Sequence, residues 1–210
     1  MTIFVSGHLP LCASIDTDVA QWFRQHLTPA FADFLLGLSQ PGSAICIASI
    51  IGVVVFYLAW KREWLGVITL LTTVGGGALM GEGMKLVFQR PRPFLAGPIG
   101  EWGGYSFPSG HTIGATLLYG LVAVVLIRIL PRRRWKWLVT CAATFLIAGV
   151  GFSRIALGAH YVSDVLAAML LGSLWILMWP RALKTAHRKW KAQAVTLSDP
   201  ISPESQNLPS

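Results

Sequence analysis

The sequence predicts an all-α fold: a polytopic transmembrane helical bundle with five clear spans, preceded by an interfacial or re-entrant helical region. The 210 residues are 54% hydrophobic and only 12% charged, whereas a soluble domain carries about 25% charged residues. The longest apolar runs are close to the ~17–25 residues that a helix needs to cross a membrane. Tryptophan, which prefers the membrane interface, lies at or near several of their ends. A soluble bundle with buried helices is therefore the less favoured alternative.

Short polar turns separate the five predicted spans, which are residues 43–60, 64–84, 113–130, 137–152 and 165–179. Before the first span, residues 16–38 have the apolar spacing of an amphipathic helix or helix pair lying in the membrane interface. Asp16 is a plausible N-cap for this region. The turn Gln40-Pro41-Gly42 separates it from the first span.

Three regions follow from this pattern. Residues 1–42 form an amphipathic, interfacial region, residues 43–180 form the transmembrane bundle, and residues 181–210 form a tail that is first basic and then disordered. The end of the tail is rich in Ser, Pro and other polar residues, which cannot form a core.

Residues 1–15 lack the basic start and the apolar stretch of a secretory signal peptide. Three cysteines, an odd number, provide no disulfide framework.

The net charge of +8 arises from an unequal distribution of basic residues between the two sides of the membrane. Twelve of the 17 Lys and Arg residues fall on one side: Lys61, Arg62, Arg128, Arg132, Arg133, Arg134, Lys136, Arg181, Lys184, Arg188, Lys189 and Lys191. The positive-inside rule places this side in the cytoplasm. The predicted protein therefore spans the cytoplasmic membrane with its amino terminus outside and its carboxyl terminus inside, and nucleic acid is not an expected partner.

Three segments on the predicted outer side hold most of the polar residues that the composition of a membrane protein does not account for. They are residues 85–93, 106–111 and 153–164. An even number of crossings separates each pair, so all three segments lie at the same membrane face. We expect them to form one site.

In the third segment, His160 and Asp164 are four residues apart and share one face if the segment is helical. The carboxylate can accept the proton of one ring nitrogen and leave the other nitrogen free for nucleophilic attack. A surface pair at the start of a helix is an equally simple interpretation of these two residues.

In the second segment, Pro108-Ser109-Gly110 leads into a helix that begins near His111. Free N–H groups at a helix N-terminus favour a phosphate. Gly110 permits close approach of the backbone, and the Ser109 hydroxyl adds a donor. His111 can act as a general acid. Alternatively, Ser109 is only an N-cap.

Basic residues from the first and third segments complete the predicted site. Lys85, Arg92 and Arg154 lie at the same membrane face, and such a cluster is unfavourable without an anion such as a phosphoryl group. Snorkelling to the interface is the alternative explanation. For Arg90 we expect a surface or headgroup contact. Glu82, an acid within a span, is expected to pair with Lys85.

Together these segments resemble the type 2 phosphatidic acid phosphatase superfamily. Its three motifs are Lys-x6-Arg-Pro, Pro-Ser-Gly-His and Ser-Arg-x5-His-x3-Asp. Here they read Lys85 to Arg92-Pro93, Pro108-Ser109-Gly110-His111, and Ser153-Arg154 to His160 and Asp164. Residues 85–164 carry the resemblance, with no departure at a motif position. Members often have six spans, so the region before residue 43 is either a sixth span or an interfacial element.

The resemblance implies a metal-independent hydrolase that acts on a membrane lipid phosphate or diphosphate and requires no cofactor. Substrates of this class include undecaprenyl diphosphate, phosphatidylglycerophosphate and phosphatidate. It implies that His160 forms a phosphohistidine, Asp164 orients it, and His111 is the general acid. The groups that it implies for holding the phosphoryl oxygens are Lys85, Arg92, Ser109, Gly110 and Arg154.

Three other functions are compatible with these motifs, and one of them is disfavoured. The same site could transfer the phosphoryl group to a second lipid, or the protein could bind or transport lipids without turnover. A vanadate-dependent haloperoxidase is disfavoured because those relatives are soluble. Neither the lipid tail nor the oligomeric state is evident from the sequence.

Overall fold

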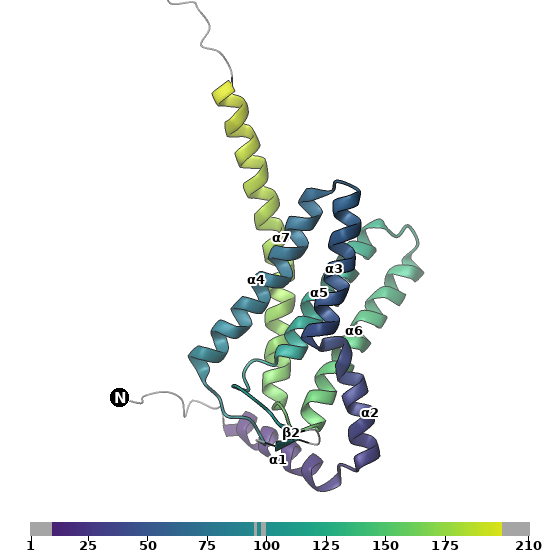
Figure 1. The fold of residues 1–210 in the computed structure, drawn as a ribbon, viewed down its shortest axis with the longest axis vertical. Helices are drawn as coiled ribbons and strands as arrows, with labels where there is room; N and C mark the ends of the chain where they lie inside the picture. Colours follow the sequence, from purple (N-terminus) through teal and green to yellow (C-terminus); the bar gives the residue numbers. More distant parts are fainter. Residues whose placement is uncertain (1–9, 95, 98–99, 199–210) are drawn as a thin grey trace, which may run out of the picture.

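A computed structural model describes residues 10–94, 96–97 and 100–198 of the chain, which are mainly helical (Figure 1). The long connection between α4 and α5 contains a two-stranded antiparallel hairpin. In chain order, the elements are α1 (Pro10–His26), α2 (Pro29–Ser39), the 3₁₀ helix η1 (Gln40–Gly42), α3 (Ala44–Trp60), α4 (Trp64–Phe88), β1 (Ala96–Gly97), β2 (Gly100–Glu101), α5 (Gly110–Ile129), α6 (Arg133–Ala156) and α7 (Val162–Ser198).

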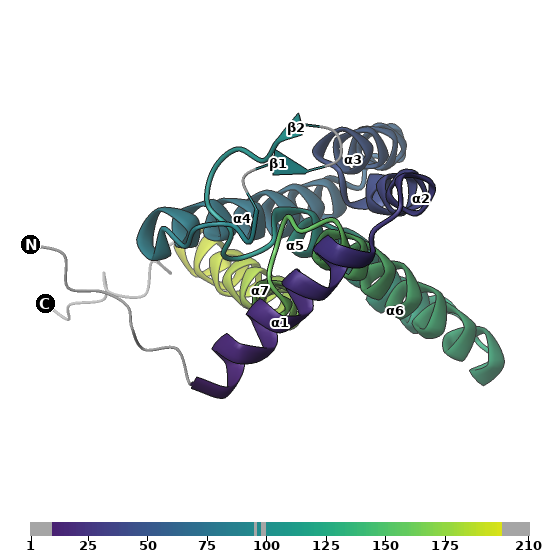
Figure 2. The ribbon, with the colours of Figure 1, turned by 90° about the horizontal axis from the view of Figure 1, so that it is seen from below.

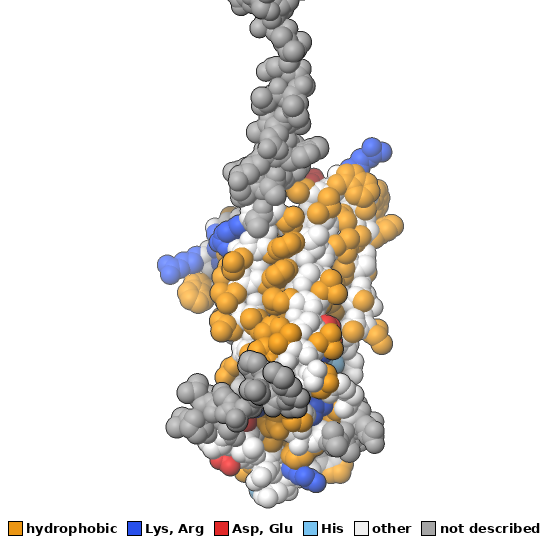
Figure 3. Space-filling model, turned by 90° about the vertical axis from the view of Figure 1, so that its left-hand side faces the viewer, with side chains coloured by type: hydrophobic (Ala, Val, Ile, Leu, Met, Phe, Trp, Pro, Cys, Tyr) orange, Lys and Arg blue, Asp and Glu red, His pale blue; other side chains and the backbone are white. Residues whose placement is uncertain are grey.

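Within the described residues, five helical segments are long and apolar enough to cross a membrane, which confirms the predicted fold class. They are Pro29–Trp60, Trp64–Phe88, Gly110–Ile129, Arg133–Ala156 and Val162–Arg181. Hydrophobic side chains cover the middle of the bundle, and Lys and Arg gather towards its two ends (Figure 3). Large apolar side chains such as Phe56 and Phe145 are more than 70% exposed. An outer surface of this kind suits lipid rather than water.

Helix α5 forms the centre of the bundle and packs against α4, α6 and α7. Its residues Leu117 and Leu118 have no exposed surface. Small residues on the neighbouring helices allow this close packing: a Cβ atom at Gly77 would lie 2.6 Å from the Leu117 side chain. Close approach at glycine is a common way for membrane helices to associate. The centre of the bundle thus holds α5 and its N-terminus in a fixed position.

The N-terminal region consists of two helices with different directions. Helix α1 lies across one end of the bundle, whereas α2 leads into α3 through η1 (Figures 1 and 2). Thr28 caps α2 by accepting a hydrogen bond from the backbone N–H of Phe31. The prediction that Asp16 is an N-cap is wrong, because α1 begins at Pro10 and Asp16 lies buried within it.

The last helix is longer than predicted. The sequence places the end of the span near Trp179, but α7 continues through Pro180 to Ser198. A proline in a helix removes one backbone hydrogen bond and need not end the helix. The residues from 199 onwards, which were predicted to be disordered, lie outside the described part of the chain.

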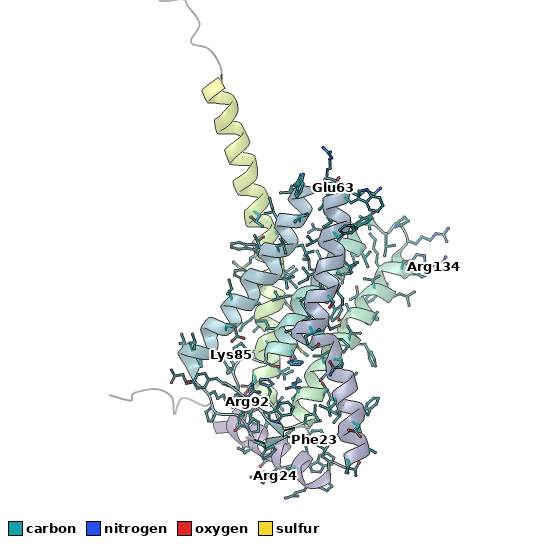
Figure 4. The ribbon with its side chains drawn as sticks, in the orientation of Figure 1. Phe23, Arg24, Glu63, Lys85, Arg92 and Arg134 are labelled. Atoms are coloured by element: carbon teal, nitrogen blue, oxygen red, sulfur yellow. The ribbon has the colours of Figure 1, made fainter. Side chains whose placement is uncertain are left out.

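The two ends of the bundle differ in the residues they carry. Lys85 and Arg92 lie at the end where α1 crosses the bundle, and Glu63 and Arg134 lie at the opposite end (Figure 4). The loops α3–α4 and α5–α6, which hold many of the basic residues, are at that opposite end. The three polar segments therefore lie away from the more basic side of the molecule, as the span count predicts.

Candidate active site

A cavity of about 400 Å³ brings together residues from all three polar segments. It opens near the N-terminus of α5, the C-terminal part of α4 and the connection between α6 and α7. Its lining consists of Leu36, Ser39, Gln40, Lys85, Arg92, Trp102, Gly103, Gly110, His111, Arg154 and His160. The predicted convergence of the segments is thus present in the structure.

His160 is buried, with 3% of its surface exposed. Its Nδ1 atom lies 2.7 Å from the backbone carbonyl oxygen of Ser106, to which a protonated Nδ1 donates. This bond fixes one tautomer and leaves the lone pair on Nε2. The Nε2 atom lies 3.2 Å from Nη1 of Arg92, at the cavity. The ring is therefore held with its Nε2 atom beside a cation that can bind an anion.

Asp164 lies behind His160 and has no exposed surface. Its Oδ2 atom is 3.8 Å from His160 Nδ1, which is too long for a direct hydrogen bond. Ser106 joins the two residues instead, because its hydroxyl donates to Oδ2 at 2.5 Å while its carbonyl accepts from the ring. Asp164 also accepts from the Tyr161 backbone N–H at 2.9 Å. The predicted His–Asp pair is thus connected mainly through Ser106.

Burial lowers the pKa of His160 below its usual value, and the nearby guanidinium groups of Arg92 and Arg154 act in the same direction. Asp164 partly opposes this shift by favouring the protonated ring. The net effect is a neutral imidazole at neutral pH, which is the form that a nucleophile requires.

His111 is the second residue of α5 and faces the same cavity. Its position depends on close packing against η1, because a Cβ atom at Gly42 would lie 2.8 Å from the His111 carbonyl oxygen. The neighbouring Gly110 faces Lys85, whose Nζ atom would be 3.3 Å from a Cβ at that position. The start of α5 therefore places a histidine and free backbone N–H groups beside a lysine.

Two arginines also line the cavity. Arg92 is held by the backbone carbonyls of Gly103, Gly104 and Ala159, at 2.8–3.2 Å. Arg154 is 5% exposed, and its guanidinium lies over the Trp102 ring at 4.6 Å. Its Nε atom is buried and lacks a hydrogen-bond partner among the described residues. A buried guanidinium with an unused donor is well suited to bind an anion.

Lys85 and Glu82 form the predicted ion pair, with Nζ and Oε1 at 2.7 Å. Their side chains differ in exposure, 17% for Lys85 and 66% for Glu82. Lys85 lines the cavity and Glu82 does not, so a bound phosphoryl group and Glu82 would share the Lys85 ammonium.

Ser109 does not line the cavity. It is fully buried at the N-cap position of α5, makes no side-chain cap bond, and accepts a hydrogen bond from the Thr112 hydroxyl at 3.0 Å. Its own hydroxyl proton therefore remains available for another acceptor. Of the predicted site residues, Ser109 and Asp164 lie behind the cavity wall, and the other six line it.

The structure corrects the expectation for Arg90, which is not a surface or headgroup contact. Its guanidinium donates to Asp164 at 2.5 Å and to Asp16 at 2.8 Å, and stacks on Tyr161 at 4.1 Å. These carboxylates outweigh the effect of burial and raise the pKa of Arg90. Sequence reasoning missed this role and that of Ser106. The available signal was an acidic residue, Asp16, within an otherwise apolar face.

No group of three or more His, Cys, Asp or Glu residues in the described part of the chain is arranged to hold a metal ion. The donors around the cavity are instead N–H groups of Lys, Arg and backbone, which suit the oxygens of an anion.

Comparison with known proteins matches residues 64–188 to the PAP2 superfamily model. The chain belongs to the PAP2 superfamily. It is 30% identical over 178 residues to phosphatidylglycerophosphatase B of Bacillus subtilis, covering 79% of this chain and 86% of that protein. It is 31% identical over 153 residues to undecaprenyl-diphosphatase of Sulfolobus acidocaldarius, covering 62% and 68%.

The fold of this PAP2 protein also matches a solved structure. That structure is a transmembrane PAP2-type phosphatidylglycerolphosphate phosphatase from Bacillus subtilis, with a TM-score of 0.73 and 27% identity. The match covers 85% of this chain and 89% of the other. The resemblance and the membrane-spanning architecture are thereby confirmed.

Proposed function

We propose that this PAP2 protein hydrolyses the phosphate or diphosphate of a membrane lipid through a phosphohistidine at His160. The observation that carries the proposal is the arrangement in one cavity of a buried histidine, a second histidine and three cations. The names of its relatives, which are those of lipid phosphatases, support the same class of reaction.

The first chemical step forms a bond between His160 Nε2 and phosphorus and breaks the bond between phosphorus and the leaving oxygen. His111 gives its proton to that oxygen, so the lipid product leaves as an alcohol or a monophosphate. Lys85, Arg92 and Arg154 stabilise the negative charge on the other phosphoryl oxygens. These residues bind more strongly to the transition state if they are aligned in advance, as Arg92 is by three backbone carbonyls.

The second step returns the enzyme to its starting state. Water attacks the phosphorus, His111 takes the proton of the water, and the bond between phosphorus and His160 breaks. Inorganic phosphate leaves, and His160 is again neutral. If a second lipid alcohol replaces the water, the same site transfers the phosphoryl group to that lipid.

An apolar groove of about 490 Å³ supports a lipid substrate. It runs between α3, α4 and α5, and it shares Lys85, Gly110 and His111 with the cavity. A lipid can therefore place its phosphate among the cations and its first tail carbons against apolar residues of the spans. The site would lie on the outer face of the cytoplasmic membrane, since the more basic loops are at the other end of the bundle.

The proposal is tested with the purified protein in detergent and chelator. Phosphatidate, phosphatidylglycerophosphate and undecaprenyl diphosphate are supplied separately, and released inorganic phosphate is measured. We expect turnover of at least one lipid, loss of turnover in His160→Ala, and retention in the control His26→Ala, whose side chain is exposed on α1. Full activity of His160→Ala would rule out the phosphohistidine. Labelled donor lipid with unlabelled acceptor lipid distinguishes hydrolysis from transfer.

A further inference from the structure

A row of buried charges connects α1 to the candidate active site. The Asp16 carboxylate lies 2.8 Å from Arg90 Nη2, and Arg90 Nη1 lies 2.5 Å from Asp164. Ser163 joins the same group: its backbone N–H and hydroxyl donate to Asp16, and its hydroxyl accepts from Arg90 at 2.7 Å. Arg90 thus bridges two carboxylates that come from opposite parts of the chain.

Burial makes each member of this row dependent on the others. Asp16 is 2% exposed and Asp164 is fully buried, so both carboxylates have lost their hydration. Arg90 has a 14% exposed side chain and satisfies both of them. Removing one partner of such a group leaves an unpaired buried charge and shifts the remaining groups. The position of the Asp164 carboxylate therefore depends on Arg90, and the orientation of Arg90 depends on Asp16.

The row continues to the reactive nitrogen. Asp164 accepts from the Ser106 hydroxyl, and the Ser106 carbonyl holds Nδ1 of His160. The backbone of Arg90 takes part as well, because its carbonyl accepts the Ser106 N–H at 2.8 Å. A displacement of Arg90 would therefore move Ser106 in two ways: through the backbone hydrogen bond between them, and through Asp164, which binds the Ser106 hydroxyl. Misplacement of a reacting group by about 1 Å can lower a rate ~100-fold.

We propose that Asp16 and Arg90 are positioning residues for His160, acting through Asp164 and Ser106, which makes the N-terminal helix α1 part of the active site. This inference rests on the proposed function. Neither residue contacts the cavity, so their effect falls on the alignment of the nucleophile and not on the cations that hold the phosphate. An anchor that only attaches α1 to the bundle would instead change the stability of the protein and leave turnover per folded molecule unchanged.

The experiment uses Asp16→Asn, which preserves shape and removes the charge, with Asp18→Asn as the matched control on the exposed face of the same helix. Arg90→Met and the double variant complete a cycle. With the lipid among phosphatidate, phosphatidylglycerophosphate and undecaprenyl diphosphate that gives the highest kcat/KM, we expect Asp16→Asn to lower kcat ~10- to 100-fold. KM should change by no more than about 2-fold, because the phosphate-holding residues are unaltered.

The double variant tests whether Asp16 acts through Arg90. We expect Asp16→Asn to have no further effect on kcat in the Arg90→Met background, because the route to Asp164 is already broken. Additive losses, or an Asp16→Asn variant that matches Asp18→Asn, would overturn the inference. If Asp16→Asn does not fold, Ser163→Ala is the milder variant, because it removes a neutral hydrogen-bond partner shared by Asp16 and Arg90. An unchanged kcat in Ser163→Ala would also count against the inference.

A second measurement does not depend on turnover. Orthovanadate mimics the five-coordinate phosphorus of the transition state when it bonds to the attacking nitrogen, so its affinity depends on the alignment of His160. This affinity is measured by calorimetry on the folded fraction of each variant. We expect ~10-fold weaker binding in Asp16→Asn and no change in Asp18→Asn. If His160→Ala keeps full turnover while Asp16→Asn still loses vanadate affinity, the proposed function fails and the positioning role stands. If His160→Ala is inactive while Asp16→Asn behaves as the control, only the positioning role fails.

Discussion

His160 is the residue whose environment most directly determines a measurable property of the enzyme. Burial lowers the pKa of its imidazole, with Arg92 and Arg154 adding to the effect and Asp164 opposing it. In the proposed mechanism His160 must be neutral to attack, and its ring becomes protonated only when the pH falls through this lowered pKa. We therefore expect the acid limb of kcat/KM to lie below the usual histidine pKa of about 6.5.

The control for this prediction is the substrate, since a phosphate group also titrates in the acidic range. The pH dependence is measured with phosphatidate and with a diphosphate lipid. An acid limb at the same pH for both belongs to the enzyme. A common limb at or above pH 6.5 would contradict the lowered pKa of His160.

Arg154 carries a second prediction at the residue scale. It is buried near Arg92 and has an unpartnered Nε, so its charge opposes stability until an anion binds. We expect Arg154→Gln to melt at the same or a higher temperature without ligand, while kcat/KM falls ~100- to 1,000-fold. Orthovanadate should raise the Tm of the parent and not that of the variant.

Arg24→Gln is the matched control for this experiment, because Arg24 is exposed and its guanidinium lies over the ring of Phe94, outside the cavity lining. It should retain activity and the response to orthovanadate. A large loss of Tm in Arg154→Gln with kcat/KM unchanged would show that Arg154 supports the fold rather than the phosphate.

The sequence could identify the site residues that are polar or charged, because such residues are rare in membrane-spanning segments. His111, His160 and Asp164 are polar and close to span ends, so their convergence follows from counting crossings. The sequence predicts a surface contact for Arg90, because its partner Asp16 lies 74 positions away in the chain and is not evident from it. The link through Ser106 depends on a backbone carbonyl, and every residue has one. The link through Ser106 therefore has no local signal in the sequence, and the link through Arg90 has only the acidic Asp16 within an otherwise apolar helix face.

At the scale of elements, the apolar groove between α3, α4 and α5 leads to a prediction about the lipid tail. Ala78 lines the groove and is exposed. A phenylalanine there can fill part of the groove without displacing core atoms. We expect Ala78→Phe to raise KM for a long-chain lipid phosphate ~10-fold and to leave a short-chain, water-soluble phosphate ester unaffected.

Leu79→Phe is the matched control, since Leu79 is on the same helix, is 74% exposed, and does not line the groove. Equal effects of the two variants on the long-chain lipid would show that the tail does not use this groove. An equal loss for both substrates in Ala78→Phe would indicate damage to the cavity instead.

The elements also show where periodicity and composition are sufficient and where they are not. Apolar length places four of the five spans within a few residues, because the thickness of the membrane sets this length. The first candidate span begins at Pro29, earlier than predicted, because it includes α2 and η1. The continuation of α7 beyond Pro180 was missed, since the polarity of the following residues indicates the membrane boundary and says little about where a helix ends. The crossing of α1 over the bundle depends on the buried pairing of Asp16, which amphipathic spacing does not reveal.

For the whole molecule, the distribution of charge predicts the orientation of the bundle. The loops near Glu63 and Arg134 are at the end away from Lys85 and Arg92 (Figure 4). Basic loops are retained in the cytoplasm, so the cavity should open on the outer side. This can be measured with a membrane-impermeant maleimide on single-cysteine variants, in a background where Cys12, Cys46 and Cys141 are replaced by serine.

Gly103→Cys reports on the cavity end, because Gly103 is exposed and a Cβ there has no neighbour within 4 Å. Arg134→Cys reports on the opposite end. In right-side-out membrane vesicles we expect labelling of Gly103→Cys at once and of Arg134→Cys only after detergent is added. The opposite order would place the active site in the cytoplasm and invert the bundle. The enzyme can reach a phosphorylated lipid only in the leaflet on which its cavity opens. In an asymmetric vesicle, the predicted orientation therefore depletes substrate from the outer leaflet, and the inverted orientation depletes it from the inner leaflet.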